Sequence, residues 1–402
     1  MNDRRLLAAL VLAPLALGAA GCGGGSPSSS GDVESLALWD GFTQYDESSP
    51  YGQLISTCEE QTGTTIERTA DQDTPDALLQ AASGGSTPDL VILDNPLVAQ
   101  FAKTGLLVDN ATSGLDASAQ RDNVLAAAQL DGQTYGASIG SNTLALFYNE
   151  DLLAQAGVEP PADWQELRDA VAATTSGDVR GIAFSAMDGE EGSFQFEPFL
   201  WGAGGDLTDL GSPEVVEALQ LWTDFVQSGQ ASQSNLNANQ QDVRDQFLAG
   251  GAAFMVNGTW QLSALDEAGI PYGVVPLPAL DGGPAPSPLG GEFIEVVVSD
   301  EATQAAAAEF AQCFVDPDNL RAWAEGQSYV LPYEDAAEEQ VEANPALRPW
   351  VDAIAVARGR TAELGADYPS VSLALSTAVQ EALTGAATPE QAAERAQATA
   401  SS

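Results

Sequence analysis

The sequence predicts an α/β protein built on a mainly parallel sheet, and three observations point to this fold class. Strand-like and helix-like segments alternate from residue 33 onward, as they do in βα units. Of the 402 residues, 44% are hydrophobic and 18% are charged, which is an ordinary globular balance. At typical sizes of about 100–200 residues per domain, a chain of this length is expected to hold about two domains.

The first half of the alternation follows from apolar runs and the residues that end them. Residues 33–39 predict a strand, and Pro50–Thr62 predicts a helix that ends at Gly63. The same reasoning gives strands at 64–69 and 89–94, helices at 74–83 and 96–104, and a longer strand at 134–148.

Capping residues mark the later helices. Asp163, Ser212, Ser299 and Thr388 each predict a helix start, because a short polar side chain there accepts a hydrogen bond from the first turn. Strands are expected at 251–256, 272–275 and 293–298, with a Gly/Pro-rich connection at 282–291.

The first residues predict an export signal. Arg4 and Arg5 precede an apolar run at 6–17, which is shorter than the roughly 20 residues that a membrane span needs. Residues 1–21 resemble a bacterial lipoprotein signal peptide, with Cys22 as the residue that carries the lipid. An ordinary signal peptide followed by a chance cysteine is the alternative. Residues 22–32 then predict a lipidated flexible tether, and we expect the protein at the cell surface, on the outer face of the cytoplasmic membrane.

Composition excludes several functions. The chain has no histidine, which excludes Ser-His-Asp catalysis and His-ligated zinc. Its formal charge of −45 argues against a nucleic-acid partner, because such binding depends on Lys and Arg. The acidic segment that begins at Asp71 departs from a calcium loop at its sixth and twelfth positions. We therefore expect no metal and no cofactor.

Two cysteines remain in the predicted mature chain beyond Cys22. Cys58 and Cys313 form an even pair, which in an exported protein is a disulfide candidate. Two separate buried thiols are the alternative. The wide separation of the two positions neither favours nor excludes the bond.

Four stretches carry a family resemblance. They are TPDLVILDNPLVAQFAKTGLL at 87–107, YGASIGSNTLALFYNEDLLAQAGVEPPADWQELRDAV at 135–171, GAAFMVNGTWQL at 251–262 and PLPALDGGPAPSPLGG at 276–291. Together they resemble the extracellular solute-binding proteins of ABC importers, in the sugar-binding family that includes maltose-binding protein. The resemblance covers nearly all of the mature chain in the same order.

The resemblance implies a two-lobed periplasmic-binding-protein-like fold, in which each lobe is a mainly parallel sheet flanked by helices. Three crossings near 141–143, 291–294 and 344–350 would hinge the lobes. The N-terminal lobe would hold 33–141 and 294–345, and the C-terminal lobe 142–293 and 346–402. Cys58 and Cys313 would then share a lobe, which favours the disulfide.

The implied function is that of a substrate-binding lipoprotein of an ABC transporter. Such a protein captures a sugar or oligosaccharide by lobe closure and delivers it to membrane permease subunits. We expect a monomer that is not an enzyme.

A sugar site needs aromatic planes for CH faces, and carboxylates and amides for hydroxyls. Trp260 follows a strand and matches the stacking tryptophan of the family; a core position is its alternative reading. Trp39 and Asp40 end the first strand, and Asp94 and Asn95 end another, where strand ends face a cleft. Asp94 has the alternative role of capping the next helix.

The resemblance adds four further ligand-binding candidates. Asn142 falls at the first crossing and Glu292 at the second. Phe196 lies in a segment that supplies an aromatic side chain in the family, and we prefer it to Trp201, which we assign to the core. Tyr368 is the nearest match to an aromatic residue near the C-terminus.

Two other functions stay open. The same fold binding a cationic solute such as a polyamine would suit the acidic surface. A secreted glycoside hydrolase would use two carboxylates, but no motif isolates such a pair. The aromatic and amide candidates suit a neutral polyol better than either.

Overall fold

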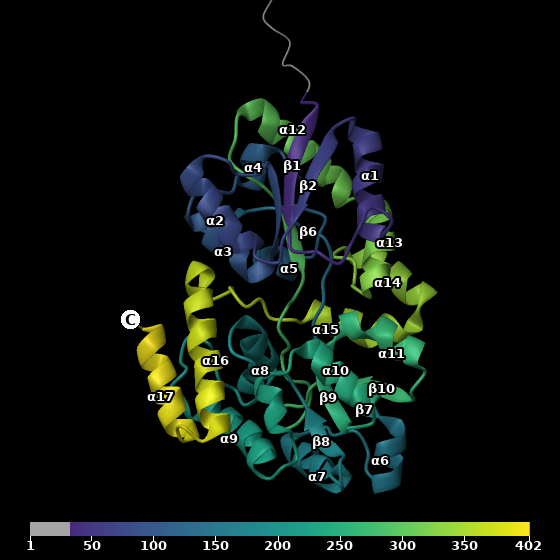
Figure 1. Cartoon of the computed structure of the whole chain (residues 1–402), viewed down its shortest axis with the longest axis vertical. Coiled ribbons are helices and arrows are strands. Elements are labelled where there is room, and N and C mark those ends of the chain that lie inside the picture. The colour runs from purple at the N-terminus through teal and green to yellow at the C-terminus, as the bar shows by residue number, and fades with distance from the viewer. Residues whose placement is uncertain (1–32, 402) are drawn as a thin grey trace, which may run out of the picture. The chain divides into compact units, whose positions relative to one another are not determined.

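The structure is a computed structural model that describes residues 33–401 (Figure 1). The predicted signal peptide at 1–21, the lipid-bearing Cys22 and the tether at 22–32 lie outside the described residues. Within the described range, no helix has both the length and the hydropathy that a membrane crossing requires.

The first sheet has the strand order β2-β1-β3-β11-β6. Its strands are β1 (Ser35–Asp40), β2 (Thr65–Ala70), β3 (Leu90–Asp94), β6 (Ala137–Ser138) and β11 (Glu292–Val296). β1 runs parallel to β2 and β3, whereas β11 runs antiparallel to β3 and β6.

Helices cover both faces of this sheet, which explains the unbroken apolar run of β3. Leu90 and Ile92 pack with α1, α12 and α13, and the alternate residues Val91 and Leu93 pack with α2 and α3. The bounds are α1 (Pro50–Thr62), α2 (Thr74–Gly84), α3 (Asn95–Lys103), α12 (Glu301–Phe314) and α13 (Pro317–Gln327).

The second sheet has the strand order β10-β7-β9-β8. Its strands are β7 (Leu144–Asn149), β8 (Arg180–Ala183), β9 (Ala252–Gly258) and β10 (Tyr272–Val275). β8 and β9 are parallel, and the other two pairs are antiparallel.

Two groups of helices cover the second sheet. One group comprises α7 (Trp164–Thr174), α8 (Glu190–Gly202), α9 (Pro213–Gln227), α16 (Tyr368–Thr384) and α17 (Pro389–Ala400). Within this group, α9, α16 and α17 pack together (Figure 1). The other comprises α10 (Gln240–Leu248), α11 (Leu262–Ala268) and α15 (Arg348–Ala355). The remaining short elements are α4 (Asn110–Ser113), α5 (Asp122–Ala126), α6 (Glu150–Ala156), α14 (Glu334–Ala343), β4 (Gln129–Leu130) and β5 (Gln133–Thr134).

The predicted α/β fold with two sheets is confirmed, and its sheets are mixed. The sheets are therefore less parallel than predicted: β1–β2, β1–β3 and β8–β9 are parallel, and strands that come from the other sheet add antiparallel pairs. The single strand expected at 134–148 is wrong. The chain leaves the first sheet after Ser138 and enters the second at Leu144, so the crossing interrupts the strand.

Most predicted helix caps are confirmed. The side chains of Asp163, Ser212 and Thr388 each accept a backbone N–H from the first turn of their helix. The prediction for Ser299 is wrong. Asp300 caps α12 instead, because its carboxylate lies one residue nearer and accepts two backbone N–H groups.

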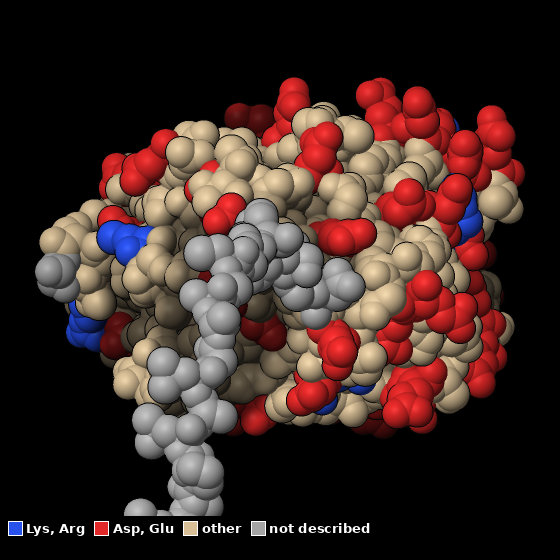
Figure 2. Space-filling model, turned by 90° about the horizontal axis from the view of Figure 1, so that it is seen from above, with Lys and Arg blue, Asp and Glu red and all other residues tan. Residues whose placement is uncertain are grey.

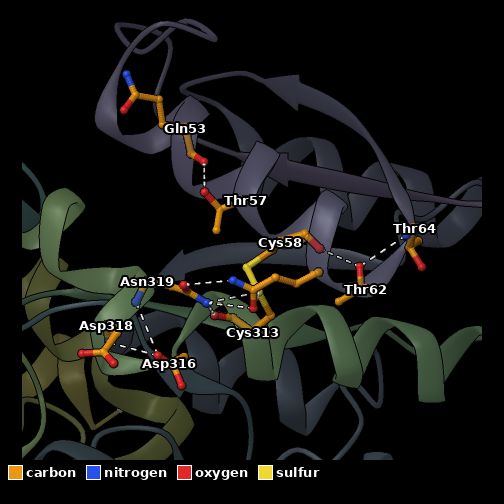
Figure 3. Close-up of a disulfide and its surroundings, with 10 residues drawn as sticks. Gln53, Thr57, Cys58, Thr62, Thr64, Cys313, Asp316, Asp318 and Asn319 are labelled. Atoms are coloured by element: carbon orange, nitrogen blue, oxygen red, sulfur yellow. Dashed lines mark hydrogen bonds between the residues drawn. A yellow bond between two sulfur atoms is a disulfide. The ribbon is translucent and has the colours of Figure 1, made fainter.

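A disulfide joins α1 to α12 (Figure 3). Cys58 and Cys313 are bonded with an S–S distance of 2.08 Å and a Cα–Cα distance of 5.7 Å. Asn319 Nδ2 donates a hydrogen bond of 2.9 Å to the backbone oxygen of Cys313. The disulfide therefore fastens α1 to α12 through two cysteines that lie 255 positions apart in the sequence.

Acidic side chains dominate the face shown in Figure 2. Asp and Glu are spread widely over it and Lys and Arg are few, in keeping with 58 acidic and 13 basic residues. Such a surface keeps a protein soluble through charge repulsion between molecules.

Candidate functional site

A cavity of about 530 Å³ is lined by strand residues of the first sheet, by helices that cover each of the two sheets and by the connections between these elements. Five aromatic side chains, six amides, four carboxyls and two guanidinium groups line it. They are Phe42, Tyr45, Phe194, Trp260 and Tyr329; Gln44, Asn142, Gln240, Gln241, Gln261 and Gln327; Asp94, Glu190, Glu191 and Glu292; Arg244 and Arg360. Its size is within the range of small-molecule sites.

Trp260 enters the cavity wall directly after β9. It lies in the short 3-10 helix Thr259–Gln261, and its ring centroid is 6.2 Å from that of Phe194. The indole folds over Gly258, where an added Cβ would come within 2.2 Å of the ring. Glycine at that position therefore lets the indole pack closely against the backbone. The Trp260 side chain as a whole is half-buried.

Arg360 holds carboxylates from two separate elements. Its Nη2 donates to Asp94 Oδ1 at 2.9 Å, and its Nη1 donates to Glu190 Oε1 at 2.5 Å. Asp94 ends β3 in the first sheet, whereas Glu190 begins α8 on the second. The guanidinium, 2% exposed, also lies over the ring of Phe194 at 4.8 Å. One side chain thus links the two halves of the cavity wall.

Glu190 is held from behind by a buried network. Burial raises the pKa of Glu190, and the nearby Arg360 and Ser372 partly offset that rise. The Tyr368 hydroxyl lies 2.7 Å from both Glu190 Oε1 and Glu197 Oε1. Burial and the charge of Glu190 raise the pKa of Glu197 to about 8. Glu197 is therefore protonated at neutral pH, and it can donate to the hydroxyl that in turn donates to Glu190.

Glu292 and Asp94 face each other across β11 and β3. The two residues are direct partners in the antiparallel pair, so their side chains share one face. Burial and the charge of Asp94 raise the pKa of Glu292 to about 8. At neutral pH the carboxyl of Glu292 is therefore mainly protonated.

The structure brings four of the predicted binding residues together. Asp94, Asn142, Trp260 and Glu292 all line the cavity. Their role in binding stays a prediction. The side chain of Asp94 makes no capping hydrogen bond to α3, which leaves its carboxylate to Arg360.

Three residues predicted at the strand ends do not line the cavity. Trp39 packs against the apolar cluster between the sheet and α3 rather than lining the cavity. Asp40 is fully buried and forms an ion pair with Arg68 at 2.7 Å. Asn95 is 1% exposed, because its Nδ2 donates to the backbone oxygens of Leu289 and Gly291.

Two of the predicted aromatic residues do not line the cavity either. Phe196 is fully buried, with its ring edge-on to Trp222 at 5.1 Å; Phe194, two residues earlier on α8, lines the cavity instead. Tyr368 is fully buried behind Glu190 and does not reach the cavity. Trp201, assigned to the core, is 5% exposed. The tryptophans at 164, 222, 323 and 350 are each at most 1% exposed and belong to the core.

Sequence reasoning missed Arg360, Glu190 and the aromatic side chains of Phe42, Tyr45 and Tyr329. Arg360 had one available signal, because basic residues are scarce in this chain and an arginine in an apolar context is unusual. Glu190 stood out only as part of an acidic pair without a motif. The aromatic residues lie in connections whose positions depend on the tertiary fold.

The described residues contain no group of three or more His, Cys, Asp or Glu side chains arranged to hold a metal ion. The cavity instead offers aromatic faces, hydrogen-bond acceptors and hydrogen-bond donors. That set can bind a solute that presents both apolar faces and hydroxyl groups.

A protein-family model described as "Bacterial extracellular solute-binding protein" matches residues 53–349. The maltotriose-binding protein of Pyrococcus abyssi is 28% identical over 273 residues, which cover 64% of this chain and 57% of that protein. The sn-glycerol-3-phosphate-binding periplasmic protein UgpB of Pectobacterium atrosepticum is 27% identical over 292 residues, covering 65% and 64%. The alignments thus span less than two thirds of the length of these two curated relatives.

Among solved structures, the GacH receptor of Streptomyces glaucescens, determined without ligand and with acarbose, superposes with a TM-score of 0.77. It is 26% identical in sequence, and the match covers 91% of this chain and 97% of that one. The architecture of two sheets on either side of a cavity is therefore shared along almost the entire described chain.

Proposed function

Because the chain belongs to the bacterial extracellular solute-binding protein family, we propose that it is the substrate-binding component of an ABC importer and that its solute is a sugar or oligosaccharide. The composition of the cavity wall carries this proposal. Five aromatic side chains line it together with six amides and four carboxyls. Aromatic planes suit the CH faces of a sugar ring, and amides and carboxyls suit its hydroxyls.

The charges of the cavity favour a neutral solute over an anionic one. Arg360 is already bound to Asp94 and Glu190, and Arg244 donates to Asp245 at 2.8 Å. Each guanidinium is therefore already paired with at least one carboxylate. The maltotriose named for the Pyrococcus relative fits such a site better than the sn-glycerol 3-phosphate named for UgpB.

Capture proceeds by lobe closure in this proposal. The N-terminal lobe, formed by residues 33–141 and 294–345, closes by a hinge motion onto the C-terminal lobe, formed by residues 142–293 and 346–402. A ligand that touches both lobes stabilises the closed form by its difference in affinity for the two forms. The permease subunits then recognise the closed protein, which acts as a monomer and leaves the solute chemically unchanged.

We also propose that the protein is held at the outer face of the cytoplasmic membrane through a lipid on Cys22. The support is the sequence of 1–22, with two arginines, an apolar run and a cysteine after small residues. In a bacterial host, Cys22→Ala should release the protein from the membrane fraction. Retention of that variant in the membrane would contradict lipid anchoring.

A ligand screen tests the proposed function. The purified protein is heated with saccharides from one to three rings, with sn-glycerol 3-phosphate and with the polyamine spermidine. A ligand at 100 times its Kd should stabilise the folded protein by about 2.7 kcal/mol. We expect stabilisation by at least one saccharide. Stabilisation by spermidine alone, or by sn-glycerol 3-phosphate alone, would overturn the proposal.

A further inference from the structure

The loop between β1 and α1, residues 41–49, supplies one wall of the cavity. Phe42, Gln44 and Tyr45 all line it. The backbone hydrogen bonds inside the loop are short-range, from Thr43 N to Gly41 O, from Tyr45 N to Phe42 O and from Ser49 N to Asp46 O. These bonds shape the loop without attaching it to the sheet, so other groups must fix where its side chains point.

Arg68, which lies on β2, reaches under this loop. Its Nη2 donates to the Phe42 carbonyl oxygen at 2.7 Å, and its Nη1 donates to the Tyr45 carbonyl oxygen at 2.6 Å. The guanidinium of Arg68 donates four hydrogen bonds in all, two to the loop and two to Asp40. The side chain is 19% exposed, so solvent screens it only partly.

Asp40 aims the guanidinium. Its carboxylate accepts from Arg68 Nε at 2.7 Å and from Nη2 at 2.8 Å, a bidentate pairing that fixes the plane of the fork. The same carboxylate accepts the backbone N–H of Phe42 at 2.8 Å and the Tyr51 hydroxyl at 3.0 Å. Asp40 is fully buried, so it does not touch a solute in the cavity.

We propose that Arg68 is a positioning residue for solute binding: held by Asp40, it fixes the carbonyls of Phe42 and Tyr45 and so presents their rings to the cavity in the ligand-free protein. This inference rests on the proposed function. Lysine cannot replace Arg68 in this role, because a single ammonium point cannot pair with Asp40 and also span two separate loop carbonyls.

The first measurement needs no variant. Hydrogen exchange of the backbone amides of 41–49 is followed in the wild-type protein with and without maltotriose. A loop fixed in advance should already be protected without ligand, to within about threefold of its rate in the bound protein. Rapid exchange that slows only when maltotriose is added would overturn the proposal.

The second measurement is a double-mutant cycle read by calorimetry with maltotriose. Arg68→Lys should weaken affinity at least fivefold in the wild-type background and less than twofold in a background that carries both Phe42→Ala and Tyr45→Ala, because Arg68 acts through those two rings. The control is Arg395→Lys, which alters an exposed ion pair to Glu381 on α16 and should leave the affinity unchanged.

The outcomes separate this proposal from the proposed function. Wild-type binding that Arg68→Lys leaves unchanged, or weakens equally in both backgrounds, would overturn the positioning role alone. A wild-type protein that binds no saccharide would count against the proposed function. Hydrogen exchange of 41–49 in Arg68→Lys, compared with wild type and with no ligand added to either, would still decide whether Arg68 orders the loop.

Discussion

Glu197→Gln should make the folded protein more stable at neutral and mildly alkaline pH. Glu197 is fully buried, and its carboxyl faces the Tyr368 hydroxyl and, beyond it, Glu190. Burial raises its pKa from the ordinary 4.5 to about 8, so the folded state holds a proton that the unfolded chain releases. Glutamine keeps the shape and a hydrogen-bond donor and removes this proton linkage.

The size of the effect follows from the difference between the two pKa values. With the folded pKa above the unfolded one, the stabilising contribution is complete below pH 4.5 and is lost as pH rises toward 8. Each pH unit within that window changes the free energy of unfolding by about 1.4 kcal/mol. From pH 5 to pH 7.5, the stability of Glu197→Gln relative to wild type should therefore rise by about 3 kcal/mol.

Urea unfolding of both proteins at pH 5, 6, 7 and 7.5 measures this difference directly. Subtracting the wild-type curve at each pH cancels the titration of groups that the substitution leaves alone, such as Glu292. A difference that stays constant across this range would refute the reasoning, because it would mean that Glu197 is already ionised in the folded protein.

Three further results are expected. Trp260→Ala should weaken saccharide binding at least tenfold, about 1.4 kcal/mol, while the unfolding midpoint in urea stays near that of wild type. If the variant unfolds more easily and its folded fraction binds with unchanged affinity, Trp260 is a core residue instead. Arg360→Gln should lower the free energy of unfolding, measured in urea, by about 2–3 kcal/mol. This is less than the roughly 3–5 kcal/mol typical of fully buried ion pairs, because the Glu190 side chain is 38% exposed. An unchanged unfolding midpoint would show that Asp94 and Glu190 do not need this partner. A tryptic digest without reductant should contain a peptide with Cys58 linked to Cys313, and reduction should lower stability by about 2–5 kcal/mol; two free thiols in the digest would remove the bond.

The fold was predictable where the signals are local. Asp163, Ser212 and Thr388 begin helices because the capping side chain and its backbone partners lie within one turn. The interruption at 139–143 was not predictable from the apolar pattern, because residues that cross between sheets are as buried as strand residues. Only their pairing with distant segments, such as Asn142 with Gly290, distinguishes them.

The site was predictable only in part. Asp94 ends β3 and Trp260 follows β9, and a strand end is a position that can face a cleft. The same signal failed at the end of β1, because Asp40 is buried in an ion pair with Arg68. Phe196 was misplaced because every residue of α8 from Gly192 onward is buried, so its sequence has no polar face to orient it. Arg360 joins Asp94 to Glu190 across 266 and 170 positions, a distance over which local patterns carry no information.

Isothermal titration calorimetry with a panel of saccharides tests the central claim most directly. The account predicts saturable heat with one site per chain for at least one saccharide, and a negative heat-capacity change as ring faces become buried against aromatic side chains such as Trp260. Saturable binding of spermidine or sn-glycerol 3-phosphate, with no heat from any saccharide, would contradict it.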